Sequence, residues 1–194
     1  INVTTFTDGR RIINWTGLAN GTYYYNASVV DVANNRNTTE NYMVTLDSGL
    51  PFANLTTPVN NSYVNSSSQN LSVNLTDNIG MVNATLYVWN ATALVNSTTQ
   101  SVSGTQNLLG IIYSFLYDGI FKWFYSVVDS AGNYFVTENN TVTVDTTFPM
   151  ISYLGADADG ANVSRNWIYV NVSVTEVNEA NITFVLWNTT DEIN

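Results

Sequence analysis

The sequence predicts an all-β protein built from tandem β-sandwich repeats of about 98 residues. Two stretches, 21–51 and 119–149, align without a gap at an offset of 98 residues, and fourteen of their 31 positions are identical. Short runs alternate apolar and polar side chains, which is the period of a half-buried strand. Turn residues separate these runs at the spacing of a sandwich, and no segment keeps a helical period. A repeat of this length corresponds to a small domain, because solenoid units are only about 20–50 residues long.

The duplicated stretch is predicted to form two strands joined by a turn. Trp123, Tyr125 and Val127 alternate with other residues, so we expect them on one face. The Asp, Gly and Asn residues of segment 129–133 suit a chain reversal. We expect Trp123 to be buried against a face that a second alternating run supplies, namely Leu71, Val73 and Leu75.

The chain divides into three parts at the repeat boundaries. Residues 1–49 are predicted to be the C-terminal half of a repeat, in which the apolar residues around Ile13 and Trp15 form a strand before a turn. Residues 50–147 contain the complete repeat, with about seven short strands. Residues 148–194 are predicted to be the N-terminal half of the next repeat.

Within the complete repeat, each expected strand follows from its own alternation or turn signal. An edge strand tolerates the proline at its start, and the Ser- and Thr-rich segment near residue 100 is expected to be a loop with a short edge strand. The expected strands before the duplicated stretch are 51–55, 71–75, 85–89 and 111–115, and the expected loop is 96–107.

Charge and residue usage exclude several classes of function. The formal net charge is −10, whereas a nucleic-acid-binding protein needs a basic face. Cysteine and histidine are absent, which removes disulfides, thiolates and the commonest general base. Asp157 and Asp159 form a carboxylate pair, but they lie in a turn between two glycines, and a glycosidase holds its two carboxyl groups in a cleft. We expect no enzymatic activity. No apolar run approaches the roughly 20 residues of a membrane span.

Glycosylation sequons are the strongest indication of compartment. The pattern Asn-x-Ser/Thr, with x not Pro, occurs eighteen times and is typical of surface positions in exported proteins. An Asn- and Thr-rich chain also forms such triplets by accident. Glycans would keep a surface soluble when only 10% of the residues are charged. The asparagines are Asn2, Asn14, Asn20, Asn26, Asn37, Asn54, Asn60, Asn65, Asn70, Asn74, Asn83, Asn90, Asn96, Asn139, Asn162, Asn171, Asn181 and Asn188.

Acidic residues fall where consecutive sandwiches would meet. Asp47 follows the last strand of one repeat, and Asp77 and Asp129 lie in two turns of the next repeat. Asp145 and Glu176 occupy the corresponding places at the second junction. Carboxylate oxygens from loops suit Ca²⁺, which takes six to eight oxygen ligands. The alternative is that each side chain only caps its own turn.

The aromatic side chains allow two interpretations. Trp89, Trp123 and Tyr125 could be platforms for stacking sugars, but their alternation favours core positions. Tyr23, Tyr24 and Tyr25 are adjacent, so their side chains must point to both faces of a strand and at least one must be exposed.

The duplicated motifs resemble a known family. The runs GTYYY, VVD and ANN within residues 21–35, and VDSAGN and TVDTTFP within residues 128–149, resemble the last strands of immunoglobulin-like or fibronectin-III-like repeats in large prokaryotic surface proteins, many of them archaeal. The resemblance covers the whole chain and implies an immunoglobulin-like sandwich. It also implies the role of such repeats, which serve as stalks, fibres and spacers. The cysteine pair of antibody domains has no counterpart here.

We therefore expect a structural extracellular protein, a filament, stalk or sheath, whose partners are copies of itself. Half a sandwich cannot bury both faces of its sheets, so the C-terminal half of one copy is expected to combine head-to-tail with the N-terminal half of the next. A chain that continues covalently would complete the halves instead. The alternative function is an adhesin or a carbohydrate-binding module. The residues expected at the contact are Trp15, Tyr25, Val29, Val170, Val172, Val174 and Trp187.

Overall fold

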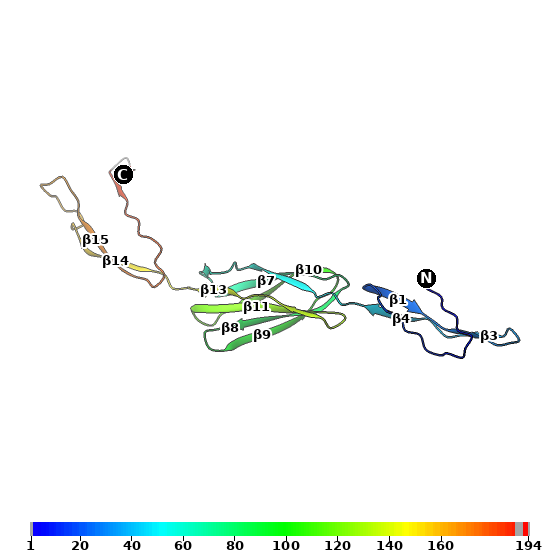
Figure 1. The fold of residues 1–194 in the computed structure, drawn as a ribbon. Helices are drawn as coiled ribbons and strands as arrows, with labels where there is room; N and C mark the ends of the chain where they lie inside the picture. Colours follow the sequence, from blue (N-terminus) through cyan, green and yellow to red (C-terminus); the bar gives the residue numbers. More distant parts are fainter. Residues whose placement is uncertain (1, 189–191, 194) are drawn as a thin grey trace. The chain divides into compact units, whose positions relative to one another are not determined.

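The protein is all-β, as the sequence predicts. A computed structural model describes residues 2–188 and 192–193, and every regular element in that range is a strand (Figure 1). The chain forms two compact units, Ile1–Asp145 and Thr146–Asn194. Over the described residues, no helix is long and apolar enough to cross a membrane.

The central part of the first unit is a β-sandwich. One sheet has the strand order β10-β7-β5, and the other has the order β6-β13-β11-β8-β9 with β12 added on β11. All pairs are antiparallel except β13 with β6. The first sheet contains β5 (Phe52–Thr57), β7 (Ser68–Thr76) and β10 (Gln106–Ser114). The second contains β6 (Ser62–Val64), β8 (Met81–Trp89), β9 (Leu94–Ser101), β11 (Gly119–Asp129), β12 (Tyr134–Val136) and β13 (Asn140–Val144).

The core lies between these two sheets and follows the period-2 alternation. Along β11, every second side chain is buried, and Trp123 is fully buried. Leu71, Val73 and Leu75 of β7 belong to the same buried cluster, so the predicted placement of Trp123 is confirmed. Burying one such aliphatic side chain contributes about 1.5–3 kcal/mol.

The segment near residue 100 is more regular than expected. The predicted loop 96–107 instead contains most of β9 and the start of β10, so the repeat has nine strands, β5 to β13, where about seven were predicted. β9 pairs with β8 as an exposed edge strand. Its Ser and Thr side chains give no alternation of apolar and polar residues. Thr85 of β8 and Thr99 of β9 nevertheless face each other across the ladder, and their hydroxyl oxygens are 2.8 Å apart.

The N-terminal part of the first unit forms two strand pairs with the registers of the sandwich. β1 pairs with β4 so that Gly21 faces Leu46, and 98 residues later Gly119 faces Val144. In the same way Ser28 faces Thr38 in the pair of β2 with β3, as Ser126 faces Val136 in the pair of β11 with β12. These strands are β1 (Gly21–Tyr25), β2 (Ser28–Val30), β3 (Arg36–Thr38) and β4 (Tyr42–Leu46).

The strand predicted around Ile13 and Trp15 does not form. The described residues 2–20 contain no strand, and both side chains remain more than a third exposed. The corresponding strand of the sandwich, β10, takes all its ladder bonds from β7. Among the described residues 2–49, no strand pairs with the segment around Ile13.

The second unit repeats the first strands of the sandwich. β14 (Met150–Ala156) pairs with β15 (Val170–Thr175), with a bulge between Tyr153 and Gly155. β5 pairs with β7 in the same register and has its irregularity between Leu55 and Thr57, 98 residues earlier. A short pair, β16 (Leu186–Trp187) with β17 (Glu192–Ile193), follows.

Candidate functional sites: an acidic junction and two uncovered faces

Three carboxylates meet where the N-terminal strands join the sandwich. Asp47 follows β4, Asp77 follows β7, and Asp129 ends β11. One oxygen from each lies within 4.8 Å of the other two. The three residues predicted to share this junction are thus adjacent in the fold.

Each carboxylate also caps its own turn, as the alternative interpretation predicts. Asp129 Oδ1 accepts hydrogen bonds from the amides of Ala131 and Asn133 at 2.9 and 2.8 Å. Asp77 Oδ2 accepts from two following amides, the nearer at 2.6 Å. Asp47 Oδ1 accepts from the amide of Gly49 at 3.0 Å. These bonds fix the turns and orient the acidic side chains toward one another.

Two oxygens are left over at this junction. Asp47 Oδ2 and Asp77 Oδ1 are buried and accept no hydrogen bond. Like charges about 4 Å apart repel by roughly 4 kcal/mol at an effective dielectric constant of about 20. Oxygens bound to one Ca²⁺ at about 2.4 Å can lie up to about 4.8 Å apart. The spacing of the three carboxylate oxygens is therefore compatible with their binding one hard cation.

The linker itself is held closely at the same place. Asn78 Nδ2 donates to Asp47 Oδ1 at 2.9 Å, and Asn133 Nδ2 donates to the Asp47 carbonyl at 3.2 Å. A Cβ atom at Gly49 would collide with the Asn78 carboxamide. The junction is therefore a set of short polar contacts between the segment after β4 and two turns of the sandwich.

The second predicted group, Asp145 with Glu176, stays a prediction. Asp145 belongs to the first unit and Glu176 to the second. Glu176 Oε1 accepts from the Asn178 amide at 2.8 Å, which copies the turn capping of Asp77.

Asp31 is a second turn residue of the Asp129 type that we did not single out. Its Oδ1 accepts from the amides of Ala33 and Asn35, both at 2.8 Å, and its Oδ2 accepts from Asn35 Nδ2. The hydrogen bond from the Asn35 side chain lowers the pKa of Asp31, and amide donation adds to this. The spacing Asp-x-Ala-x-Asn, present in both copies of the repeat, was the available signal.

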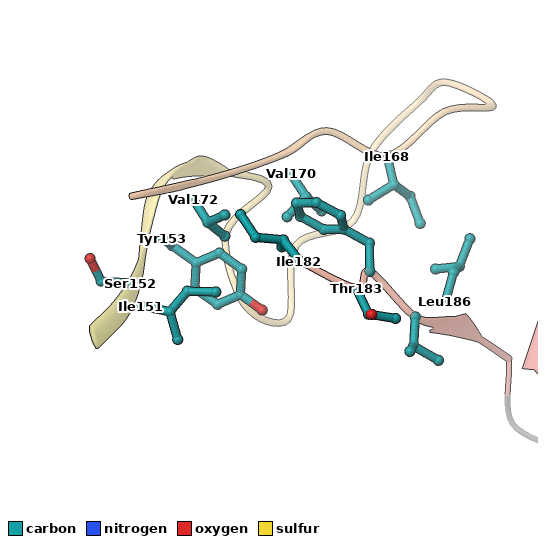
Figure 2. A pocket seen from close by; sticks show the side chains of 11 residues that line it. Ile151, Ser152, Tyr153, Ile168, Val170, Val172, Ile182, Thr183 and Leu186 are labelled. Atoms are coloured by element: carbon teal, nitrogen blue, oxygen red, sulfur yellow. The ribbon is translucent and has the colours of Figure 1, made fainter. Parts of the chain in front are cut away.

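The second unit has an uncovered apolar groove of about 820 Å³ (Figure 2). Side chains from β14, β15 and the segment before β16 surround it. Tyr153, Val170, Val172 and Ile182 are among the labelled side chains that line it in Figure 2. The lining residues are Ile151, Ser152, Tyr153, Ile168, Val170, Val172, Ile182, Thr183, Phe184, Val185 and Leu186.

The N-terminal strands have an uncovered apolar face of their own. Tyr25 is 44% exposed and Val29 is 66% exposed. Trp15 and Tyr42 contact Tyr25, with ring centroids 6.4 and 5.8 Å away. Of the residues predicted to lie at a contact between copies, Trp15, Tyr25, Val29, Val170 and Trp187 are exposed in their own units, and Val172 and Val174 are half-buried.

The aromatic predictions hold only in part. Trp123 and Tyr125 are fully buried, so their core placement is confirmed. Trp89 is 39% exposed, and its core placement was wrong. It follows Val88, whose side chain takes the core-facing position, so Trp89 must face outward. Tyr24 and Tyr25 are the exposed residues of the tyrosine triplet, and Tyr23 is half-buried.

The pair Asp157 and Asp159 does not form a carboxylate dyad. Asp157 binds the Arg165 guanidinium and accepts from the Tyr169 amide at 3.0 Å. These contacts, the amide first, lower the pKa of Asp157. Asp159 is exposed. The arrangement is a braced turn.

All the sequon asparagines are at least partly accessible. Asn83, Asn90, Asn96 and Asn171 are half-buried, and the others are exposed. Asn74 is exposed between the buried Val73 and Leu75, as predicted.

Comparisons with known proteins assign no family to the chain. No family model matches the chain, and no curated protein matches it. Two solved structures are similar to parts of it. An engineered protein matches with a TM-score of 0.41 and 15% identity over 49% of this chain. A beta-glucosidase from Listeria innocua, in complex with glucose, matches with a TM-score of 0.33 and 13% identity over 52% of this chain. The matches span only 20% and 17% of those proteins.

Proposed function

We propose that this protein is a structural component of an extracellular surface array, a filament, stalk or sheath built from immunoglobulin-like β-sandwich repeats of about 98 residues. The observation that carries the proposal is the recurrence of strand registers. The pairs β1–β4 and β14–β15 repeat the pairs β11–β13 and β5–β7, down to the position of a bulge. Arrays of near-equivalent domains set lengths and spacings, and they need no reactive centre.

The surface supports an extracellular location. All eighteen sequon asparagines lie in the described residues, and each is exposed or half-buried. Glycans on these positions would solvate a surface with few charges. In such an array, the outer faces of the sheets carry the asparagines and contact solvent. The apolar residues that alternate with them contact another sheet.

Calcium is the cofactor that this role favours. We assign it to Asp47, Asp77 and Asp129, with Asp145 and Glu176 as the corresponding residues of the next junction. The two buried oxygens that accept no hydrogen bond support this assignment. A cation there would join the segment after β4 to the sandwich and stiffen the array at its joint.

Immunogold electron microscopy of intact cells, with antibodies raised against residues 50–147, tests the proposal. The antigen carries the whole buried cluster of the sandwich, from Ala53 to Val144, within its limits. Labelling along surface filaments or a sheath is expected. Labelling confined to the cell interior would contradict the extracellular role.

An adhesive or carbohydrate-binding role is the second candidate. It is favoured by the aromatic residues on the outer face of the sandwich, where Trp89 is exposed and Tyr87 stacks on Phe124 with ring centroids 4.9 Å apart. Glycan-array binding that is lost in Trp89→Ala would support this role over the structural one.

A further inference from the structure

We propose that N-linked glycans on Asn70 and Asn74 protect the edge strand β10 of the central sandwich and cover the apolar side chains on its outer side. This inference rests on the proposed role as a glycosylated extracellular protein. It goes further because it names two modification sites, the surface that their sugars occupy, and the purpose of the modification. The surface is formed by Leu108, Gly110 and Ile112 of β10 (Figure 1).

β10 is the least protected strand edge of the sandwich. Among the described residues it pairs with β7 alone, so the backbone groups along its other side are available to another chain. Proteins commonly protect such edges by short length, bulges, proline or charged side chains. β6 and β12 have only three residues each, and bulges or irregularities interrupt the ladders of β5 and β9. β10 has nine residues without proline, and its register with β7 is unbroken.

The sheet that contains β10 also has no charge to keep other copies away. None of the residues of β5, β7 and β10 is acidic or basic, although the chain has a formal net charge of −10. Leu108 is 69% exposed and Ile112 is 76% exposed. A long, uncharged edge strand with exposed aliphatic side chains is a site at which identical chains pair and aggregate. A protein that repeats this domain in an array therefore needs another protection for the edge.

The sequon asparagines of β7 lie directly beside the two exposed aliphatic side chains. In the ladder between β7 and β10, Asn74 faces Leu108 and Asn70 faces Ile112. All four residues are exposed. Residues directly opposite each other in an antiparallel pair have Cβ atoms about 4.5–5.5 Å apart. The first sugar on each asparagine is therefore within reach of one aliphatic side chain.

The Asn70 side chain already lies over β10. A Cβ atom at Gly110 would collide with the Asn70 carboxamide and would lie 2.9 Å from its Nδ2, the atom that carries an N-linked sugar. Gly110 stands between Leu108 and Ile112, so its missing side chain leaves the space that this carboxamide occupies. In the described part of the chain, neither the Asn70 nor the Asn74 side chain makes a hydrogen bond, so a sugar on either one breaks no internal contact.

A sugar fits this surface chemically. A pyranose ring has a face of C–H groups that can pack on aliphatic side chains and remove apolar area from water, while its hydroxyls stay hydrated. The bulk of a glycan beside the edge also obstructs an incoming strand, which must approach to within about 4.8 Å of β10. The same modification thus covers Leu108 and Ile112 and supplies the barrier that other edge strands obtain from charge or bulges.

Removal of the two glycans tests the protection of the edge. In the full chain produced in its source organism, Asn70→Gln combined with Asn74→Gln should lower the protein concentration at which copies associate by about tenfold or more, because pairing would bury exposed aliphatic side chains. Sedimentation velocity measures this concentration. The matched control, Asn65→Gln combined with Asn139→Gln, removes two exposed sequons next to β6 and β13 of the other sheet and should leave association unchanged. Equal changes in the two variants would overturn the proposal.

A charged side chain should replace the missing sugars. Ile112→Lys, added to the variant without the two glycans, gives β10 a protection that other edge strands use and should restore the association behaviour of the parent. The control for net charge is Ile120→Lys in the same variant, because Ile120 is 63% exposed on the other sheet and should not restore it. Failure of Ile112→Lys to restore the behaviour, or equal restoration by both lysines, would contradict the role of the edge.

A thermodynamic cycle tests the packing of the sugars. Leu108→Ser combined with Ile112→Ser should lower the melting temperature of the glycosylated chain by about 4 °C more than that of the variant without the two glycans. The intrinsic cost of the two serines is the same in both backgrounds, so the difference reports the contact with sugar. Equal shifts in the two backgrounds would exclude that contact.

Peptide mass spectrometry of the parent separates this proposal from the structural role. Sugar on both Asn70 and Asn74 is expected. A chain that lacks sugar at either position but still labels surface filaments would overturn this proposal and leave the structural role. Copies whose glycans protect β10, but which are found in neither filaments nor a sheath, would do the reverse.

Discussion

The phenol of Tyr125 donates a 2.8 Å hydrogen bond to the main-chain carbonyl of Leu71 across the sandwich core. Tyr125 lies on β11 of one sheet and Leu71 on β7 of the other, and both are fully buried. Burial raises the pKa of Tyr125, so the phenol stays protonated and keeps donating. This bond fixes the two sheets in register at a point where apolar contacts alone would allow them to slide.

Tyr125→Phe removes the donor and leaves the ring in place. The Leu71 carbonyl then loses this buried hydrogen bond, and we expect the free energy of unfolding to fall by about 1–3 kcal/mol. Chemical denaturation of residues 50–147 measures the change. Tyr63→Phe is the matched control, because Tyr63 is 67% exposed and should change stability by less than about 0.5 kcal/mol. Equal effects in the two variants would contradict the role of the bond.

Trp123→Ala should cost about 3–5 kcal/mol, because it removes the largest fully buried side chain and leaves a cavity. Trp89→Ala removes the same side chain from an exposed position and should cost much less. Thermal unfolding of both variants makes the comparison. An unaltered melting temperature for Trp123→Ala would be incompatible with its place in the core.

Calcium should raise the melting temperature of the whole chain, because a ligand that binds only the folded state stabilises that state. At a concentration one hundred times the dissociation constant, the stabilisation is about 2.7 kcal/mol. EDTA should reverse the effect. In Asp77→Asn the shift should be lost, while the calcium-free variant should be no less stable than the parent, since one repulsive charge is gone. The control is Asp159→Asn, because Asp159 is an exposed turn residue outside the cluster and its substitution should leave the calcium response unchanged. A calcium response that survives in Asp77→Asn would exclude this site.

Alternation predicted the central core correctly, and its errors have physical causes. The period of 2 predicts the buried face of β11 correctly, but it does not determine which of the two faces of β8 is buried. Val88 is on the buried face, so the adjacent Trp89 is on the exposed one. Segment 96–107 was expected to be a loop with only a short edge strand, because an exposed edge strand of Ser and Thr such as β9 has no apolar period. The segment around Ile13 has the pattern of a strand, but a strand also needs an edge to pair with.

The acidic junction was predictable because the repeat supplied the topology. Sequence separation hides the contact, since Asp47 and Asp129 are 82 positions apart. Placing both residues on the ends of sandwich strands brings them to one junction. The hydrogen bonds of Asn78 and Asn133 to Asp47 could not be predicted, because they depend on side-chain orientation within turns.

Glycan occupancy should follow the geometry of each asparagine. Asn74 is exposed on the outer side of β7, and its amide nitrogen is available for modification on a strand that faces solvent. Asn90 is half-buried, its Oδ1 accepts from the amides of Thr92 and Ala93, and its Nδ2 donates to the Tyr117 hydroxyl at 2.9 Å. A glycan on Asn90 would disturb that turn, so we expect high occupancy at Asn74 and low occupancy at Asn90. Peptide mass spectrometry of protein from its native source measures both on one sample. An unmodified polypeptide would remove the argument for a glycosylated surface, and higher occupancy at Asn90 than at Asn74 would show that local geometry does not select the sites.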